Sequence, residues 1–333
     1  MIDWLSLLIP CPHTTPVDGG KIWVIDPDGS VRESLRWAEA EGSHCDKVRV
    51  RSHGWDSGAY QYLYVSGNPA KFFQGHNLIG PECVDLVRAF GQAVFELIKV
   101  PGLAIAEGRE WFINRIDITR MYDLGTDSDC HAWLKAAEQR VTVKHRGRGV
   151  LDRGTFYVGK HSQRSSLKIY AKGPEFRRRK PRPESNLPVE KMKDWAVGKL
   201  RFETVWRRKE LERRGLRELS MWTDELPSEL FESFISQCGL DMRSGLDVSE
   251  IRELPPAWRG IYHQWLAGVD LPQIMSRATW YRWRKRFIAL GLDIAADPPQ
   301  AGEVIPFVRT LEAVPATVPH WLAKTAWQQS CSA

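Results

Sequence analysis

Residues 154–172 of the chain read GTFYVGKHSQRSSLKIYAK. Two short runs of β-favouring residues flank a polar and basic connection, which predicts a β-hairpin with its loop over Lys160–Ser165. In the second run apolar and polar side chains alternate, so each kind lies on its own face of the strand. The polar face carries Lys168, Tyr170 and Lys172. The pattern therefore predicts a phenol between two ammonium groups on one side of a strand.

This arrangement suits chemistry on a phosphate. Nearby cations favour the phenolate form of a tyrosine and can hold a phosphate group against it. Tyr170 is therefore the candidate nucleophile, and a DNA phosphate is its candidate target. Lys168 and Lys172 are the cations that would hold the phosphate. The alternative is that Tyr170 is a half-exposed packing residue, which is the common role of a strand tyrosine beside lysines.

The distribution of charge supports a nucleic-acid partner. The chain of 333 residues has a net charge of +6, and its pI is about 9.0. Residues 140–182 hold 14 Lys and Arg but only two acidic residues, a local net charge of +12. Such a concentration of cations is typical of a surface that binds phosphates. The candidate DNA-binding residues in this segment are Lys160, Arg164, Arg177 and Arg178. The run Arg177–Lys180, taken alone, is also compatible with a solvated loop.

Two other predicted strands, 111–120 and 199–206, share an unusual pattern. Each places an arginine and an acid two residues apart on a polar face, as Arg115-x-Asp117 and Arg201-x-Glu203. Acids are disfavoured in strands unless they have a partner or a role. We interpret Asp117 and Glu203 as ligands of Mg²⁺ or Mn²⁺, which prefer oxygen, and the two arginines as DNA contacts. The alternative is two internal salt bridges.

His76 is the third candidate ligand, or it positions the phosphate. A single histidine in a loop is more often a structural hydrogen-bonding residue.

Length and segment patterns predict two domains. Residues 1–220 alternate strands and helices, with an amphipathic helix over 81–100 and an exposed basic, proline-rich connection at 174–188. These features predict an α+β fold with a mostly antiparallel central sheet and flanking helices. Tyr60, Tyr62 and Tyr64 alternate on one face of a further predicted strand.

Residues 221–333 are predicted to form a smaller helical domain that ends in a proline-rich tail. The segment 258–290 has the rhythm of a helix-turn-helix unit. Its last helix interleaves cations with aromatic residues, as expected of a recognition helix in a major groove or of a surface helix with an aromatic core stripe. Its candidate DNA-binding residues are Arg282, Arg284 and Lys285.

The six cysteines are scattered, with no C-x-x-C motif and no His/Cys cluster at zinc spacing. We therefore expect no structural zinc and a reducing compartment. The apolar start 1–9 is interrupted by Asp3, is too short for a membrane span and lacks a basic region before it. We interpret it as a first strand and expect no membrane association.

Several short segments, taken in order, resemble the replication initiators of filamentous phages, the gene II protein family. The resemblance runs along most of the chain and rests on the order and spacing of Met1–Asp3, Pro69–Lys71, Gln74–Asn77, Arg115–Asp117, Tyr170–Lys172, Arg201–Glu203 and Val304–Arg309. The hairpin is also similar to the active-site hairpin of plasmid rolling-circle initiators, which ends in a similar Tyr-x-Lys pattern.

The resemblance implies a site-specific, metal-dependent nickase. Such an enzyme cuts one strand of supercoiled double-stranded DNA at the origin, keeps the 5′ phosphate on a tyrosine, and leaves a 3′ hydroxyl for a host polymerase. It later rejoins the displaced single strand. In this chain Tyr170 matches the nucleophile and Lys172 its neighbouring cation. In the implied reaction Lys168 and Lys172 would help neutralise the phosphate, and Lys172 would also protonate the leaving 3′ oxygen. The implied single-stranded nick site needs rings for stacking, which Tyr60, Tyr62 and Tyr64 or some of the 15 Trp would provide. Many related nickases carry a His-hydrophobic-His motif, and no His-x-His occurs here. The ligand set Asp117, Glu203 and His76 is thus inferred from this chain alone.

The implied partners are supercoiled origin DNA, single-stranded DNA, and the host replication helicase and polymerase, in the cytoplasm of the bacterial host. A homo-oligomer at the origin is a further expectation. Two alternatives stay open at this stage. A non-enzymatic DNA-binding regulator would need only the basic segment and the late helix. A tyrosine recombinase would attach to DNA through a 3′ phosphate, without a metal.

Overall fold

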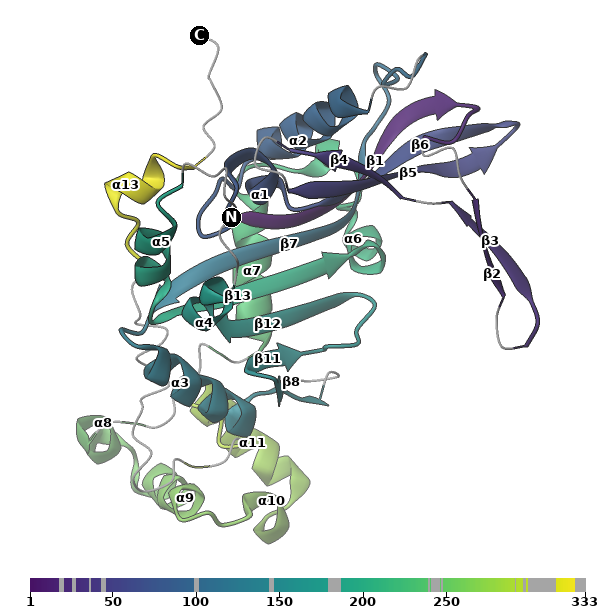
Figure 1. Ribbon diagram of the computed structural model, residues 1–333. Coiled ribbons are helices and arrows are strands. Elements are labelled where there is room, and N and C mark those ends of the chain that lie inside the picture. The colour runs from purple at the N-terminus through teal and green to yellow at the C-terminus, as the bar shows by residue number, and fades with distance from the viewer. Residues whose placement is uncertain are drawn as a thin grey trace.

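In the computed structural model, a nine-stranded antiparallel sheet forms the body of the protein (Figure 1). The structure describes residues 1–17, 21–25, 28–35, 37–42, 46–98, 102–143, 147–178, 187–238, 240, 246, 248–290, 292–295, 298 and 316–326. In spatial order the strands are β10 (Val150–Asp152), β11 (Thr155–Val158), β12 (Ser165–Ala171), β13 (Lys199–Arg207), β7 (Phe112–Asp123), β1 (Ile2–His13), β6 (Ala59–Gly67), β5 (Lys47–Asp56) and β4 (Ala38–Glu41). The predicted α+β class with an antiparallel sheet is confirmed.

Two small ribbons lie outside this sheet. One pairs β2 (Lys21–Ile25) with β3 (Val31–Leu35) and extends away from the body (Figure 1). The other pairs β8 (Thr142–Val143) with β9 (Gly147–Arg148).

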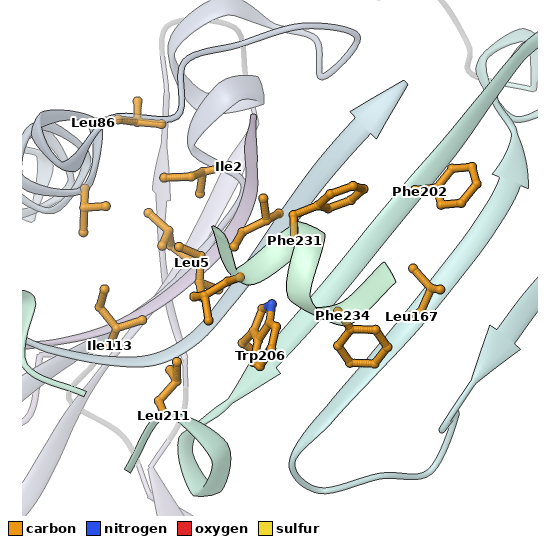
Figure 2. Packing of buried hydrophobic residues seen from close by; sticks show 14 of the residues in the cluster. Ile2, Leu5, Leu86, Ile113, Leu167, Phe202, Trp206, Leu211, Phe231 and Phe234 are labelled. Carbon is orange, nitrogen blue, oxygen red and sulfur yellow. The ribbon is translucent and has the colours of Figure 1, made fainter. Parts of the chain in front are cut away.

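The apolar core fills one side of the sheet. Alternate residues of the strands point to this side, where they meet α2 (Val84–Leu97), α3 (Asp127–Arg140), α6 (Arg208–Arg214) and α7 (Leu226–Gln237). Figure 2 shows Trp206 of β13 against Phe234 of α7, and their ring centroids are 5.6 Å apart. Helix α2 approaches closely because Gly91 lacks a side chain: an added Cβ would lie 2.3 Å from the Trp111 ring. The sheet therefore has one apolar face and leaves its other face to polar residues.

Short helices pack around one end of the sheet. They are α1 (Pro69–Gln74), α4 (Lys172–Arg177), α5 (Val189–Ala196) and α13 (His320–Ala323). Phe176 of α4, Met192 of α5 and Leu322 of α13 share a small apolar cluster. The end of the described chain thus returns to the sheet domain. Most of the predicted proline-rich tail, and residues 179–186 of the basic connection, lie outside the described residues.

A separate helical unit holds α8 (Val248–Glu253), α9 (Pro256–Leu266), α10 (Leu271–Ile274) and α11 (Arg277–Ile288). It has its own core, which includes Tyr262, Trp265 and Phe287. The side chain of Ser276 caps α11 by accepting a hydrogen bond from the backbone N–H of Thr279 at 3.2 Å. The predicted domain boundary at residue 220 lies within the short 3₁₀ helix η1 (Leu219–Met221), before α7. Helix α7 nevertheless belongs to the core of the sheet domain.

The role of α7 leads to a prediction about stability. We expect Phe234→Ala to lower the free energy of unfolding by about 3–5 kcal/mol, because it opens a cavity between α7 and β13. Met221, which is 54% exposed, provides the control: Met221→Ala should change that free energy by about 0.5 kcal/mol or less. Chemical denaturation of both variants measures the difference. Equal effects would show that α7 is not part of this core.

Candidate functional site

A polar pocket of about 310 Å³ opens on the face of the sheet opposite the apolar core. Its lining includes Tyr170 and Lys168 of β12, Glu203 of β13, and Asp117 and Arg115 of β7. Strand register explains the gathering, because Lys168 pairs directly with Glu203, and Val205 pairs with Asp117. Five residues that the sequence analysis singled out from three separate segments therefore share one pocket.

Tyr170 lies at the end of β12, half-buried in this pocket. Burial raises the pKa of its hydroxyl well above the ordinary value of a tyrosine, and Arg201, on the paired strand, offsets only part of that rise. Glu203 and Asp3 raise it further. The prediction that the neighbouring lysines favour the phenolate is wrong for the resting protein. The phenol is protonated, so it needs a proton acceptor before it can attack.

Neither lysine counters the effect of burial, because each is engaged with a carboxylate. Lys168 donates to Glu203, and Lys172 donates to Glu175 with an Nζ–Oε2 distance of 2.5 Å. Strand β12 ends at Ala171, and α4 starts at Lys172. Lys172 therefore leaves the alternating pattern. It is fully buried, with Nζ 5.8 Å from the centre of the Tyr170 ring, and it does not line the pocket.

Asp117 is buried and held by the guanidinium of Arg115. The two donated hydrogen bonds measure 2.8 Å from Nε and 2.6 Å from Nη2. Burial nevertheless raises the pKa of Asp117 to about 7, more than Arg115 lowers it, and the nearby charge of Glu203 raises it further. Two carboxylates thus sit close enough to oppose each other's ionisation. The internal salt bridge Arg115–Asp117, one of the alternatives from the sequence, is present.

Arg201 does not pair with Glu203, and it is fully buried, so it is not positioned to touch DNA. Its guanidinium bonds Asp3 at 2.9 Å and donates to the carbonyl of Asn77. Burial alone would raise the pKa of Asp3, but Arg201 and Lys172 hold it well below its usual range, helped by hydrogen bonds from Asn68 and Asn77. No role for Asp3 at the site was predicted from the sequence. Its signal was a charge inside an otherwise apolar first strand.

His76 does not join the carboxylates. Its imidazole is buried, and Nε2 lies 2.8 Å from the hydroxyl of Thr325. Among the described residues no three His, Cys, Asp or Glu side chains are grouped so that they could hold a metal ion. Asp117 and Glu203 are the remaining candidates. Two carboxylates suit Mg²⁺ or Mn²⁺, which takes few protein oxygens and keeps sites for water and phosphate.

The other predicted DNA contacts lie outside the pocket, on surfaces at different places. Arg164 and Arg178 are exposed; Lys160 pairs with Asp152 and Arg177 with Asp127, and both of these cations are partly exposed. On α11, Arg282 and Lys285 are exposed. Arg284 is instead bound to Asp293 by two hydrogen bonds of 2.8 and 2.7 Å, so it stabilises the helical unit.

Within the described residues, none of the helices has the length and apolar character needed to cross a membrane. Two family models match the chain, and both describe a phage replication-associated protein of the gene II type. The model of the N-terminal region of that protein matches residues 1–225, and the model of its C-terminal region matches residues 246–326.

Relatives agree with these matches. The replication-associated protein of Enterobacteria phage I2-2 is 34% identical, with 96% of this chain and 95% of that protein covered. A rolling-circle replication initiator from Geobacillus stearothermophilus covers 65% of this chain and 77% of its own, at 14% identity and a TM-score of 0.26, a score that does not establish a common fold. On the two family models and the relative of nearly equal length, the chain belongs to the gene II family of phage replication-associated proteins.

Proposed function

We propose that this protein is a metal-dependent DNA nickase and strand-joining enzyme that acts through a 5′-phosphotyrosine on Tyr170. One observation carries the proposal: Tyr170 lines the same pocket as the buried carboxylates Asp117 and Glu203. Membership in a family of replication-associated proteins supports DNA as the substrate. The expected substrates are supercoiled origin DNA in the first reaction and the displaced single strand in the second.

The proposed step balances as a transesterification. The Tyr170 oxygen bonds to phosphorus, the bond between phosphorus and the 3′ oxygen breaks, and a 3′ hydroxyl leaves. The phenol proton passes to a carboxylate of the pocket, and the leaving oxygen takes a proton from Lys168, the lysine that lines the pocket. Because the phosphotyrosine keeps the energy of the phosphodiester, the reverse step rejoins the strand without ATP.

Each residue around the phosphate has a separate role. A divalent cation held by Asp117 and Glu203 would polarise the phosphate and stabilise the charge of the transition state. Arg115 would contact a phosphate oxygen, since its side chain lines the pocket and is about one-third exposed. Lys172 is a positioning residue, because it is buried against the Tyr170 ring and holds Glu175 and Asn77.

Covalent attachment is the first test. Wild-type protein with Mg²⁺ or Mn²⁺ should form a covalent adduct with single-stranded origin DNA that is retained after denaturation, because the phosphate stays on the enzyme. Tyr170→Phe should reduce the adduct to background, and EDTA should do the same. Tyr157 of β11 lies opposite Lys168 and provides the control. Tyr157→Phe removes a phenol hydroxyl from the neighbouring strand and should still form the adduct.

The outcomes separate the alternatives. An adduct with Tyr170→Phe contradicts the assignment. If the wild type and both variants bind DNA but none forms an adduct, the protein is a DNA-binding regulator. Attachment through a 3′ phosphate would indicate a recombinase.

A second prediction concerns pH. The raised pKa of Asp117 means that its carboxylate, the form needed to accept a proton or bind a cation, predominates only above about pH 7. Protons and the cation compete for this carboxylate, so at a metal concentration below saturation the rate of adduct formation should rise as the pH rises through this value. Glu203→Gln removes a charge that raises the Asp117 pKa, so the titration midpoint of Asp117, followed by carboxyl NMR, should move to lower pH. Asp152→Asn, at an exposed carboxylate, should leave it unchanged. A midpoint near the ordinary aspartate pKa would contradict this description of the pocket.

A third prediction concerns duplex DNA and α11. Replacing Arg282 and Lys285 with Ala should weaken binding of origin duplex, and the slope of log affinity against log salt should fall by about 0.9 for each phosphate that the variant no longer neutralises. Arg284→Ala should instead lower the free energy of unfolding of the helical unit by on the order of 1 kcal/mol, because its bond to Asp293 is partly exposed. Fluorescence anisotropy and thermal unfolding measure the two effects. Unchanged duplex affinity in the double variant would exclude α11 as a DNA-binding element.

A further inference from the structure

The polar face of the sheet continues beyond the pocket across β1, β6 and β5, and there it carries rings and cations. Cross-strand register places Tyr64 of β6 opposite Arg51 of β5, and Tyr62 opposite His53. Trp4 of β1 joins this face, because its indole N–H donates to the hydroxyl of Ser66, two residues from Tyr64. We call these residues the aromatic strip: Trp4, Trp37, Arg51, Tyr62, Tyr64 and Arg115.

The strip alternates rings with guanidinium groups. The Arg51 guanidinium carbon lies 4.4 Å from the centre of the Trp37 ring and 5.3 Å from that of Tyr64. At the other end, the Arg115 guanidinium lies 5.6 Å from the Trp4 ring and also binds Asp117. Arg115 therefore belongs both to the strip and to the pocket, so the two surfaces are continuous.

The cations of this face are incompletely partnered. The Nε atoms of Arg51 and of nearby Arg217 are buried and have no hydrogen-bond partner among the described residues. The structure gives Arg51 no ion pair with any described carboxylate, whereas Arg217 pairs with Glu212 at 3.1 Å. Burial lowers the pKa of His53, and the charges of Arg51, Arg208 and Arg217 lower it further. A concentration of positive charge that disfavours a further cation is suited to an anion.

The rings are accessible as well. Trp37 is 37% exposed, and Tyr62 and Tyr64 are half-buried, so each of these residues is partly accessible to solvent. From β12 to β5 the face spans five interstrand spacings, roughly 24 Å. Single-stranded nucleic acid offers what this surface lacks: flat unpaired bases for the rings and one phosphate per nucleotide for the cations. A duplex keeps its base faces stacked inside and cannot use the rings.

We propose that the aromatic strip binds the single-stranded DNA that flanks the nick, with bases stacked on Trp37 and Tyr64 and a phosphate on Arg51. This inference rests on the proposed function for the identity of the strand as DNA. The strand that enters the pocket past Arg115 continues over Trp4 toward β5. The strip thereby holds the strand in a defined register while the phosphate at Tyr170 reacts.

Binding to a fluorescein-labelled (dT)20 oligonucleotide tests this in the full chain with Tyr170→Phe, so that no covalent step interferes. Tyr64→Leu and Trp37→Leu should each weaken binding by on the order of tenfold, because each removes a stacking ring. Tyr64→Phe and Trp37→Phe keep a ring and should bind as the parent does. Arg51→Ala should reduce the salt slope by about 0.7, whereas Arg88→Ala, on exposed α2 surface, should not.

Thermal unfolding identifies any variant that fails to fold. Tyr64→Phe and Trp37→Phe keep a ring at each position, so they still test stacking if a Leu variant does not fold. Parent-like (dT)20 binding by both Leu variants would overturn the strip as a binding site. An equal loss of binding to a blunt hairpin duplex, or a change in oligomeric state with no change in DNA binding, would overturn it too. If the strip variants behave as expected but wild-type protein never forms an adduct, the strip stands and the nickase proposal fails.

Discussion

The buried ion pair between Asp3 and Arg201 is the interaction on which the rest of the site depends. It joins the first strand of the chain to β13, and Asn68 and Asn77 complete its hydrogen bonds. Two charges removed from water are stable only when they are well paired and hydrogen-bonded. This pair therefore fixes how β13 and the segment around Asn77 meet, and with them the position of Tyr170 directly across from Arg201.

The same constraint governs the whole polar face. The carboxylates around the pocket each have a cation: Asp117 has Arg115, Glu203 has Lys168, and Glu175 of α4 has Lys172. The resting pocket is thus nearly neutral, and its phenol remains protonated. An arriving phosphate would compete for Lys168 and Arg115. The carboxylates of Glu203 and Asp117 would then lose these cations as partners. The proposed reaction on a phosphate diester would use this exchange of ionic partners.

Local patterns in the sequence predicted much of this arrangement. The hairpin, the polar faces of β7 and β13, and the amphipathic helix α2 follow from periodicity, so Tyr170, Lys168, Asp117 and Glu203 could be assigned to one sheet face. The burial of Lys172 could not be predicted, because β12 ends one residue earlier, at Ala171, and Lys172 is the first residue of α4. Partners distant in sequence were also beyond reach: His76 meets Thr325 across 249 positions, and nothing near either residue indicates the contact. The pairing of Arg201 with Asp3 was hidden for the same reason.

The most direct measurement of the central claim is the chemical identity of the DNA–protein linkage. An adduct formed with origin DNA would be digested with nuclease and trypsin and sequenced by mass spectrometry. The account predicts that the modified peptide is Ile169–Lys172, with a nucleotide joined through its 5′ phosphate to Tyr170. A nucleotide on any other residue, or a linkage through a 3′ phosphate, would contradict it.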